Sequence, residues 1–235
     1  MAFKLLERFR GLFEGQRYLH RRSNIGDQVA SYLYDDLFDL GRSPKFVAAV
    51  RGEQRVINVA NVSVGRSARR GDGTFGERVP NAPAIVVPEH LVSFGQVATV
   101  DIGIEVKVLA KAMIKQLDRV GTDMINQVSE FQRHGDNPIC IGIVGINRAR
   151  SYVSFEGVRE WPTNGRKNPH PYQEADQAER RLLQRILPAY DEVIVLRYLA
   201  TNVDPYPFNW EDANATQTLY AASLLRISRE YERRF

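Results

Sequence analysis

Two carboxylates and an amine are spaced to share one side of a short apolar segment. Residues 98–109 read ATVDIGIEVKVL, so Asp101, Glu105 and Lys107 alternate with β-branched residues. Successive side chains of a β-strand point to opposite faces. The segment therefore predicts a strand with the three charged groups on one face and an apolar row on the other. Charges on a central strand are costly unless they pair or bind a metal ion.

This grouping has the components of metal-assisted phosphodiester hydrolysis. Carboxylate oxygens are ligands that Mg²⁺ prefers, and bound Mg²⁺ activates water and stabilises charge on a phosphate. Asp101 and Glu105 would supply the carboxylates. Lys107 would orient the attacking water or neutralise the reacting phosphate. A buried ion pair between Lys107 and one of these carboxylates is the structural alternative.

The segment belongs to a predicted strand–helix–strand unit. Apolar residues recur at steps of three and four between Met113 and Phe131, which is the spacing of a helix. Gly135 and Pro138 are typical residues at which a helix ends. Residues 138–147 (PICIGIVGIN) predict a second buried strand.

The Glu105-Val106-Lys107 sequence, with Asp101 upstream and the strand–helix–strand unit around it, resembles the core of the PD-(D/E)XK nucleases. The resemblance covers residues 24–147. It implies a restriction-endonuclease-like α/β fold, in which helices flank a central mixed β-sheet. It also implies an endonuclease that uses Mg²⁺ or Mn²⁺ to hydrolyse DNA in line, leaving a 3′ hydroxyl and a 5′ phosphate.

Two other interpretations stay open beside the nuclease. The first is a catalytically inactive module on the same scaffold, which binds nucleic acid or a partner protein. The second is an unrelated α/β fold in which the charges of the strand form a buried salt bridge. Metal binding separates the enzyme from both, because a metal that binds only the folded protein stabilises it.

The resemblance implies further site residues. The family often has an acid early in its first helix, and Asp27 matches it, although an acid there also stabilises the helix N-terminus. Glu89 follows Pro88 where the family usually has Pro-Asp, so Glu89 competes with Asp101 as the first metal ligand. Strand alternation favours Asp101. Gln116 matches a polar residue that the family often carries near the site; the alternative is a solvated helix face.

Residues 65–83 (GRSARRGDGTFGERVPNAP) are rich in glycine and arginine and lack an apolar period, which predicts a long loop. Gly71-x-Gly73-x-x-Gly76 lies within it, but prolines follow instead of a helix, which excludes the dinucleotide fingerprint. The arginines of this loop would contact DNA phosphates, or the loop is simply solvated. These arginines are Arg66, Arg69, Arg70 and Arg78.

The remaining patterns predict helices at 2–14, 25–41, 174–187 and 212–234, and strands at 46–50, 55–64, 84–87, 152–155 and 192–199. The first helix is amphipathic, which suits packing on its own domain, on a second subunit or on a membrane surface. We expect this helix and a basic connector over residues 1–23, and a single α/β domain over residues 24–235.

Composition limits the partners and the compartment. The net charge is +4, which is compatible with DNA but does not identify it. Cys140 is the only cysteine, which favours a reducing, cytoplasmic location. The chain lacks an apolar run of the roughly 20 residues that span a bilayer, and its N-terminus lacks the apolar core of a signal peptide, so we expect no stable membrane association. Cutting both strands of a duplex would favour a homodimer.

Overall fold

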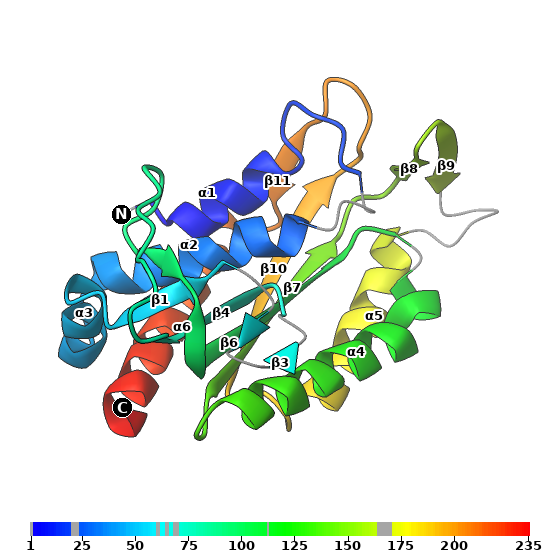
Figure 1. Cartoon of the computed structure of the whole chain (residues 1–235). Coiled ribbons are helices and arrows are strands. Elements are labelled where there is room, and N and C mark those ends of the chain that lie inside the picture. Colours follow the sequence, from blue (N-terminus) through cyan, green and yellow to red (C-terminus); the bar gives the residue numbers. More distant parts are fainter. Residues whose placement is uncertain are drawn as a thin grey trace.

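The chain folds into a mixed β-sheet that is covered by helices on both faces (Figure 1). The computed structural model describes residues 2–19, 24–59, 62–63, 66–67, 71–111, 113–163 and 171–235, with the backbone alone at 62–63, 66–67 and 171–173. The seven strands of the main sheet lie in the order β11-β10-β7-β6-β4-β1-β5. The predicted class, α/β with a central mixed sheet flanked by helices, is confirmed.

The elements have the following bounds. The helices in the described part of the chain are α1 (Lys4–Gly11), α2 (Ile25–Leu40), α3 (Pro44–Arg51), α4 (Met113–His134), α5 (Pro171–Ile186) and α6 (Ala213–Arg234). The strands of the main sheet are β1 (Arg55–Asn58), β4 (Gly73–Arg78), β5 (Phe94–Gly95), β6 (Val97–Leu109), β7 (Ile139–Asn147), β10 (Glu192–Ala200) and β11 (Phe208–Trp210). Two separate antiparallel pairs are β2 (Val62–Ser63) with β3 (Arg66–Ser67), and β8 (Tyr152–Glu156) with β9 (Arg159–Thr163).

The centre of the sheet is parallel. Strand β6 pairs with β7, and β7 pairs with β10, both in parallel. Parallel neighbours need a crossover connection. Helix α4 forms the connection between β6 and β7, and α5 is part of the connection between β7 and β10. Every residue of β7 is buried, as expected for a strand covered on both faces. The predicted strand–helix–strand unit is therefore confirmed.

The helices form two layers. Helices α1, α2 and α6 share one apolar core with the sheet, while α4 and α5 share a second core on the opposite face (Figure 1). Leu5, Leu6 and Phe9 of α1 are buried in the first core, so the amphipathic N-terminal helix packs on its own chain. Among the described residues, none of the helices combines the length and the apolar character needed to span a membrane.

Asp36 of α2 fixes the start of α1. The backbone N–H groups of Lys4 and Leu5 donate to its carboxylate at 2.8 and 3.1 Å, and the Tyr220 hydroxyl donates at 2.8 Å. The first N–H groups of a helix lack partners within the helix. The buried carboxylate of Asp36 satisfies two of them from another element and thereby sets the position of α1 on α2.

Three short segments differ from the sequence prediction. Residues 46–50 belong to helix α3 and are not a strand, because Pro44 in the first turn and the Ser43 cap are strong helix-start signals. The strand predicted at 84–87 is reduced to an isolated bridge. The strand predicted at 55–64 ends at Asn58.

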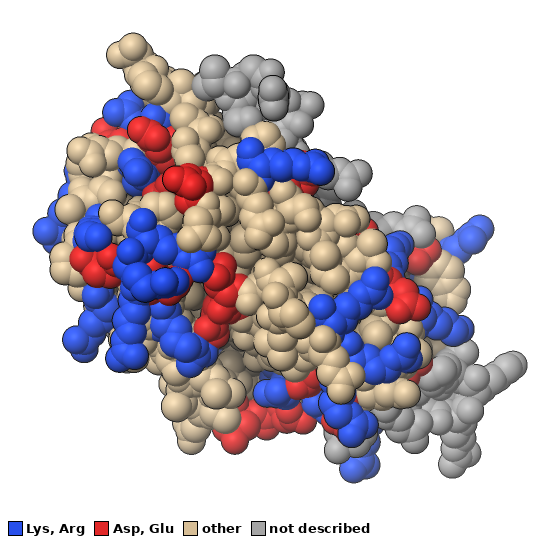
Figure 2. Space-filling view, turned by 90° about the horizontal axis from the view of Figure 1, so that it is seen from below, with Lys and Arg blue, Asp and Glu red and all other residues tan. Residues whose placement is uncertain are grey.

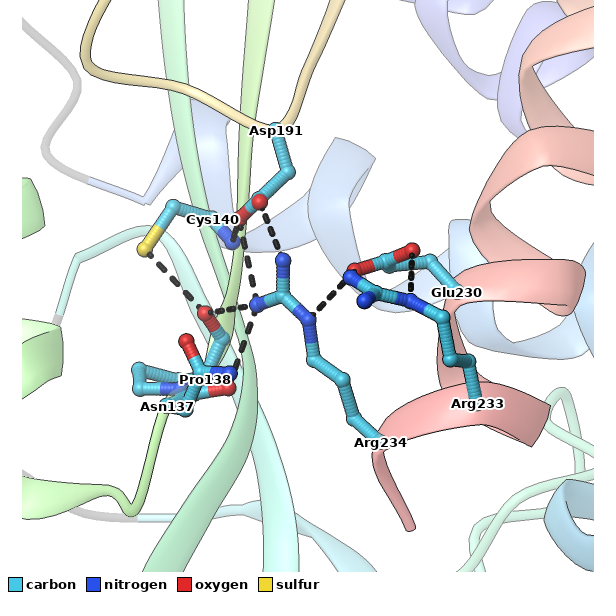
Figure 3. Close-up of polar contacts among 7 residues, drawn as sticks. All are labelled: Asn137, Pro138, Cys140, Asp191, Glu230, Arg233 and Arg234. Carbon is cyan, nitrogen blue, oxygen red and sulfur yellow. Dashed lines mark hydrogen bonds and ion pairs between the residues drawn. The ribbon is translucent and has the colours of Figure 1, made fainter.

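Arg234 fastens the end of α6 to the sheet (Figure 3). Its guanidinium donates to the carbonyl of Pro138 at 2.8 Å and forms ion pairs with Asp191 and Glu230. Asp191 in turn accepts a hydrogen bond from the N–H of Cys140 at 2.8 Å. The Arg234 side chain is only 10% exposed. One largely buried cation therefore joins the end of α6 to the chain just before β7 and β10.

We expect Arg234→Ala to lower the free energy of unfolding by about 2–3 kcal/mol, because it removes the cation that pairs with Asp191 and donates to backbone carbonyls. Urea unfolding followed by circular dichroism measures this loss. Arg233→Ala is the matched control. Arg233 is an exposed neighbour that pairs with Glu230, so its removal should leave the urea midpoint nearly unchanged. An equal loss in both variants would contradict the fastening role of Arg234.

Candidate active site

Asp72, which was not among the predicted site residues, lies beside the C-terminal part of β6. It directly precedes β4, which pairs antiparallel with β6 so that Gly73 lies opposite Ile104. The Asp72 carboxylate accepts a hydrogen bond from the N–H of Val106 at 2.7 Å. The predicted loop over residues 65–83 is therefore wrong for Gly73–Arg78, where β6 supplies the pairing partner that makes a strand.

Glycines allow β4 to lie this close to its neighbours. A Cβ atom at Gly76 would overlap the carbonyl oxygen of Thr99 on β6. A Cβ atom at Gly73 would lie 2.8 Å from the Cβ atom of Ala30 on α2. The Gly-x-Gly-x-x-Gly spacing is thus a packing pattern here, because glycine alone tolerates such close approach.

Glu105 and Lys107 point to the face of the sheet that α4 and α5 cover. The Lys107 ammonium donates to Glu105 Oε1, and the two side chains are 27% and 8% exposed. Gly142 is the neighbour of Glu105 on β7. Met124 and the Tyr190 ring fill the space that a side chain at Gly142 would take. The structure therefore brings together two of the three residues that the strand pattern selected.

The pKa of Glu105 is raised from 4.5 to about 7. Burial of the carboxyl is the largest cause, and the negative charge of Asp72 is the next; the ion pair with Lys107 opposes them only partly. The pKa of Lys107 is also raised, because the charges of Glu105 and Asp72 outweigh its burial. Two carboxylates thus share one ammonium, and their excess negative charge favours a further cation.

Asp101 faces away from Glu105, contrary to the expected alternation. The pairing of β4 with β6 skips Asp101, so this residue is a β-bulge, and a bulge changes the direction of side chains. Its carboxylate accepts hydrogen bonds from Arg55 Nε at 2.7 Å and from the Tyr231 hydroxyl of α6 at 2.9 Å. Burial raises the pKa of Asp101, although Arg55 opposes this. Asp101 is therefore a buried ion-pair partner on the α6 face.

Asp27 and Glu89 line a cleft that Asp72 also lines. The first turn of α2 lies directly against Asp72, since a Cβ atom at Gly26 would overlap the Asp72 carboxylate. A helix N-terminus carries partial positive charge and therefore favours this carboxylate. Glu89 is exposed and accepts a hydrogen bond from Tyr32. The structure thus places both predicted extra ligands in the cleft of Asp72.

Gln116 lies apart from these groups. Its Nε2 donates to the carbonyl of Lys111 at 2.9 Å, and it lines a separate pocket at the start of α4 with Arg119. The α4 residue that acts electrostatically on Glu105 is Asp123, which lies two turns further along the helix. Helix α4 therefore brings a different polar residue toward Glu105 from the one that was predicted.

Arg78 is the member of the predicted DNA-binding set whose side chain is described. Its Nε donates to the carbonyl of Glu53 at 2.8 Å, and its guanidinium also donates to the carbonyl of Ala82. Arg78 thus joins two chain turns near the end of β4. Arg69, Arg70 and the side chain of Arg66 lie outside the described residues.

The carboxylates of Asp72 and Glu105 are the groups of this site that could hold a metal ion. In the part of the chain that the structure describes, no group of three or more His, Cys, Asp or Glu side chains is arranged to hold a metal ion. Mg²⁺ keeps several waters and is commonly held by one or two carboxylates together with substrate phosphates. Asp72 and Glu105 supply two such carboxylates, and their shared negative charge is the feature that a divalent cation would neutralise.

Asp72 carries only a weak signal in the sequence. It stands between two glycines in a segment without an apolar period, far upstream of Glu105. An acid that precedes Glu-x-Lys on a neighbouring strand was the pattern to look for, but β4 itself was not predicted.

No family model, no curated protein and no solved structure matches the chain.

We expect Glu105→Gln to make the protein more stable than wild type at about pH 8, by about 1–3 kcal/mol. Because the pKa of Glu105 is raised in the folded state, its stabilising contribution is complete below pH 4.5 and is lost as pH rises through about 7. The difference between the two proteins should therefore vanish near pH 4.5. Thermal unfolding across this pH range, without divalent cations, measures it.

The matched control for this experiment is Asp118→Asn on the exposed side of α4, where the side chain is 88% exposed. Asp118→Asn should differ in stability from wild type by the same amount at every pH. A Glu105→Gln protein that is less stable than wild type at about pH 8 would show that the ion pair with Lys107 outweighs the burial of Glu105.

Proposed function

We propose that the chain is a metal-dependent endonuclease that hydrolyses phosphodiester bonds in DNA, with Asp72, Glu105 and Lys107 at its active site. The observation that carries the proposal is the meeting of two carboxylates and one ammonium beside Val106 in the middle of the sheet. The resemblance of Glu105-Val106-Lys107 to the PD-(D/E)XK nucleases supports it. In this proposal, Asp72 takes the role of first acid in place of Asp101.

Each residue of the site has a distinct part in the proposed reaction. Asp72 and Glu105 would hold Mg²⁺ or Mn²⁺, which when bound activates water and stabilises charge on the phosphate. The Glu105 carboxylate keeps the Lys107 ammonium in place through their ion pair. Lys107 then orients the attacking water by hydrogen bonding and neutralises charge that develops on the phosphate. Burial strengthens both effects, because water screens the charges less.

The distribution of charge suits a polyanionic substrate that arrives with a cation. Figure 2 shows Lys and Arg side chains gathered on either side of a band of uncharged residues, with Asp and Glu side chains among them. Basic side chains attract DNA phosphates. The site itself carries excess negative charge, so we expect the phosphate to bind there only when a divalent cation is present.

The location and assembly of the protein form part of the same proposal. A homodimer would present one site to each strand of a duplex. A cytoplasmic location fits the single, buried cysteine, Cys140, which has no disulfide partner within the chain. Both statements concern the setting of the reaction, and the site residues do not depend on them.

A second candidate function is a binding module without catalysis, for nucleic acid or for a partner protein. The ion pair between Lys107 and Glu105 favours it, because such a pair would neutralise a buried charge in any fold. The two candidates differ in their response to divalent cations and in the production of cut DNA.

We expect the protein to nick supercoiled plasmid or a single-stranded DNA circle in Mg²⁺ or Mn²⁺. Asp72→Asn, Glu105→Gln and Lys107→Met should each lower the rate by about 100-fold or more. Each change removes either a metal ligand or the ammonium that neutralises charge on the phosphate. Gel assays of initial rates measure this. Asp101→Asn is the matched control and should keep at least a tenth of wild-type activity. Loss in Asp101→Asn with retention in Asp72→Asn would reverse the assignment of the first acid.

We further expect millimolar Mn²⁺ to raise the melting temperature of wild type and not that of Asp72→Asn. A ligand that binds only the folded state stabilises it by mass action. Differential scanning fluorimetry with and without the chelator EDTA measures the shift. A folded wild-type protein that neither responds to the metal nor cuts DNA would favour the binding module.

A further inference from the structure

A cleft of about 400 Å³ opens beside the candidate active site, between α2 and the turn that carries His90. Asp72 and Asp27 are among its lining residues, and Tyr32, His90 and Phe94 supply aromatic rings. Pockets of about 300–1,000 Å³ are typical of small-ligand sites. The cleft is therefore large enough for one nucleotide and too small for a duplex.

The aromatic wall of the cleft is held rigidly. The rings of Tyr32 and His90 are stacked with centroids 4.4 Å apart, and Phe94 meets His90 edge-on at 4.9 Å. His90 Nδ1 lies 3.1 Å from Oδ2 of the fully buried Asp35, which also accepts from the N–H of Leu91 at 2.8 Å. A fixed aromatic surface of this kind stacks on nucleobases with little regard to their identity.

A buried donor lies at the same cleft. Arg8 of α1 lines it and donates to the side-chain oxygen of Gln28. The Nε atom of Arg8 is buried without a hydrogen-bond acceptor among the described residues. Because Nε itself is inaccessible, what Arg8 offers a base or a phosphate in the cleft is the positive charge of its guanidinium. The Arg8 charge also acts on Tyr32, which places the two side chains near each other.

We propose that this cleft takes up one unstacked nucleobase next to the scissile phosphate, so that the enzyme acts on single-stranded or locally unpaired DNA. The inference rests on the proposed function, because Asp72 belongs to both the cleft and the active site. Tyr32 follows Asp27 by five residues on α2, which is roughly 7.5 Å along the helix axis. The aromatic rings and the Asp72 carboxylate thus line one cleft.

The fully paired duplex does not fit this arrangement. In a duplex the faces of the bases are stacked on their neighbours, and only base edges are accessible in the grooves. A base must leave the stack to enter the cleft. Leaving the stack costs least free energy where the base is already unpaired. The cleft is lined by aromatic rings and by Asp72, a combination that suits an extrahelical base attached to a phosphate.

Binding of a fluorescent adenine analogue tests the proposal. The protein carries Lys107→Met, which keeps the DNA intact, and the analogue stands in a single-stranded oligonucleotide or in the matching duplex, with Mn²⁺. We expect quenching and tight binding with the single strand only. Tyr32→Leu should weaken binding about 5-fold or more, since stacking contributes about 1–3 kcal/mol per base. Tyr32→Phe should bind as before, because it keeps the ring.

Trp161→Leu is the matched control, because this exposed ring lies on β9 and not in the cleft. Equal binding of single strand and duplex, or an unchanged affinity in a folded Tyr32→Leu protein, would overturn the inference. Metal-dependent cleavage that is lost in Asp72→Asn would in that case leave the proposed function standing. If wild type neither binds nor cuts any DNA, both proposals fail together.

Discussion

The pairing of β4 with β6 determines the arrangement of the candidate active site. It places Asp72 against the backbone of Val106, near the C-terminal end of the central strand. The same pairing contains the bulge that turns Asp101 toward Arg55 and α6. The irregular pairing of β4 with β6 thus places Asp72 near Glu105 and turns Asp101 away from it. Its close approach depends on glycine, because a Cβ atom at Gly76 would overlap β6.

The electrostatics of the site follow from that geometry. Glu105 and Asp72 are acids within range of each other, and Lys107 alone cannot balance both. Burial raises the pKa of Glu105 and strengthens each remaining interaction. The proposed divalent cation would neutralise the charge that Lys107 leaves unbalanced, and this is how the proposed chemistry would depend on the fold.

The site draws on both layers of the fold. Glu105 and Lys107 face α4, whereas the first turn of α2 meets Asp72 from the other side of the sheet. Helix α1 adds Arg8 to the cleft, and α1 is itself fixed by the Asp36 carboxylate on its first N–H groups. Elements that are distant in the chain therefore define one cleft, with Asp72 at the junction of the two faces.

The sequence alone determined the central strand–helix–strand unit, the long helices and the placement of Glu105 and Lys107 on one face of a strand, because strong periodicity and short-range spacing survive any tertiary context. It also indicated the α/β class. Strand β4 escaped prediction, because a glycine-rich segment becomes a strand only when a partner supplies its hydrogen bonds. The register of β4 on β6 decided two further features. It turned Asp101 and Glu105 in opposite directions, and it made Asp72 the neighbour of Glu105. A bulge of one residue changes which face a side chain occupies, and local spacing does not encode it.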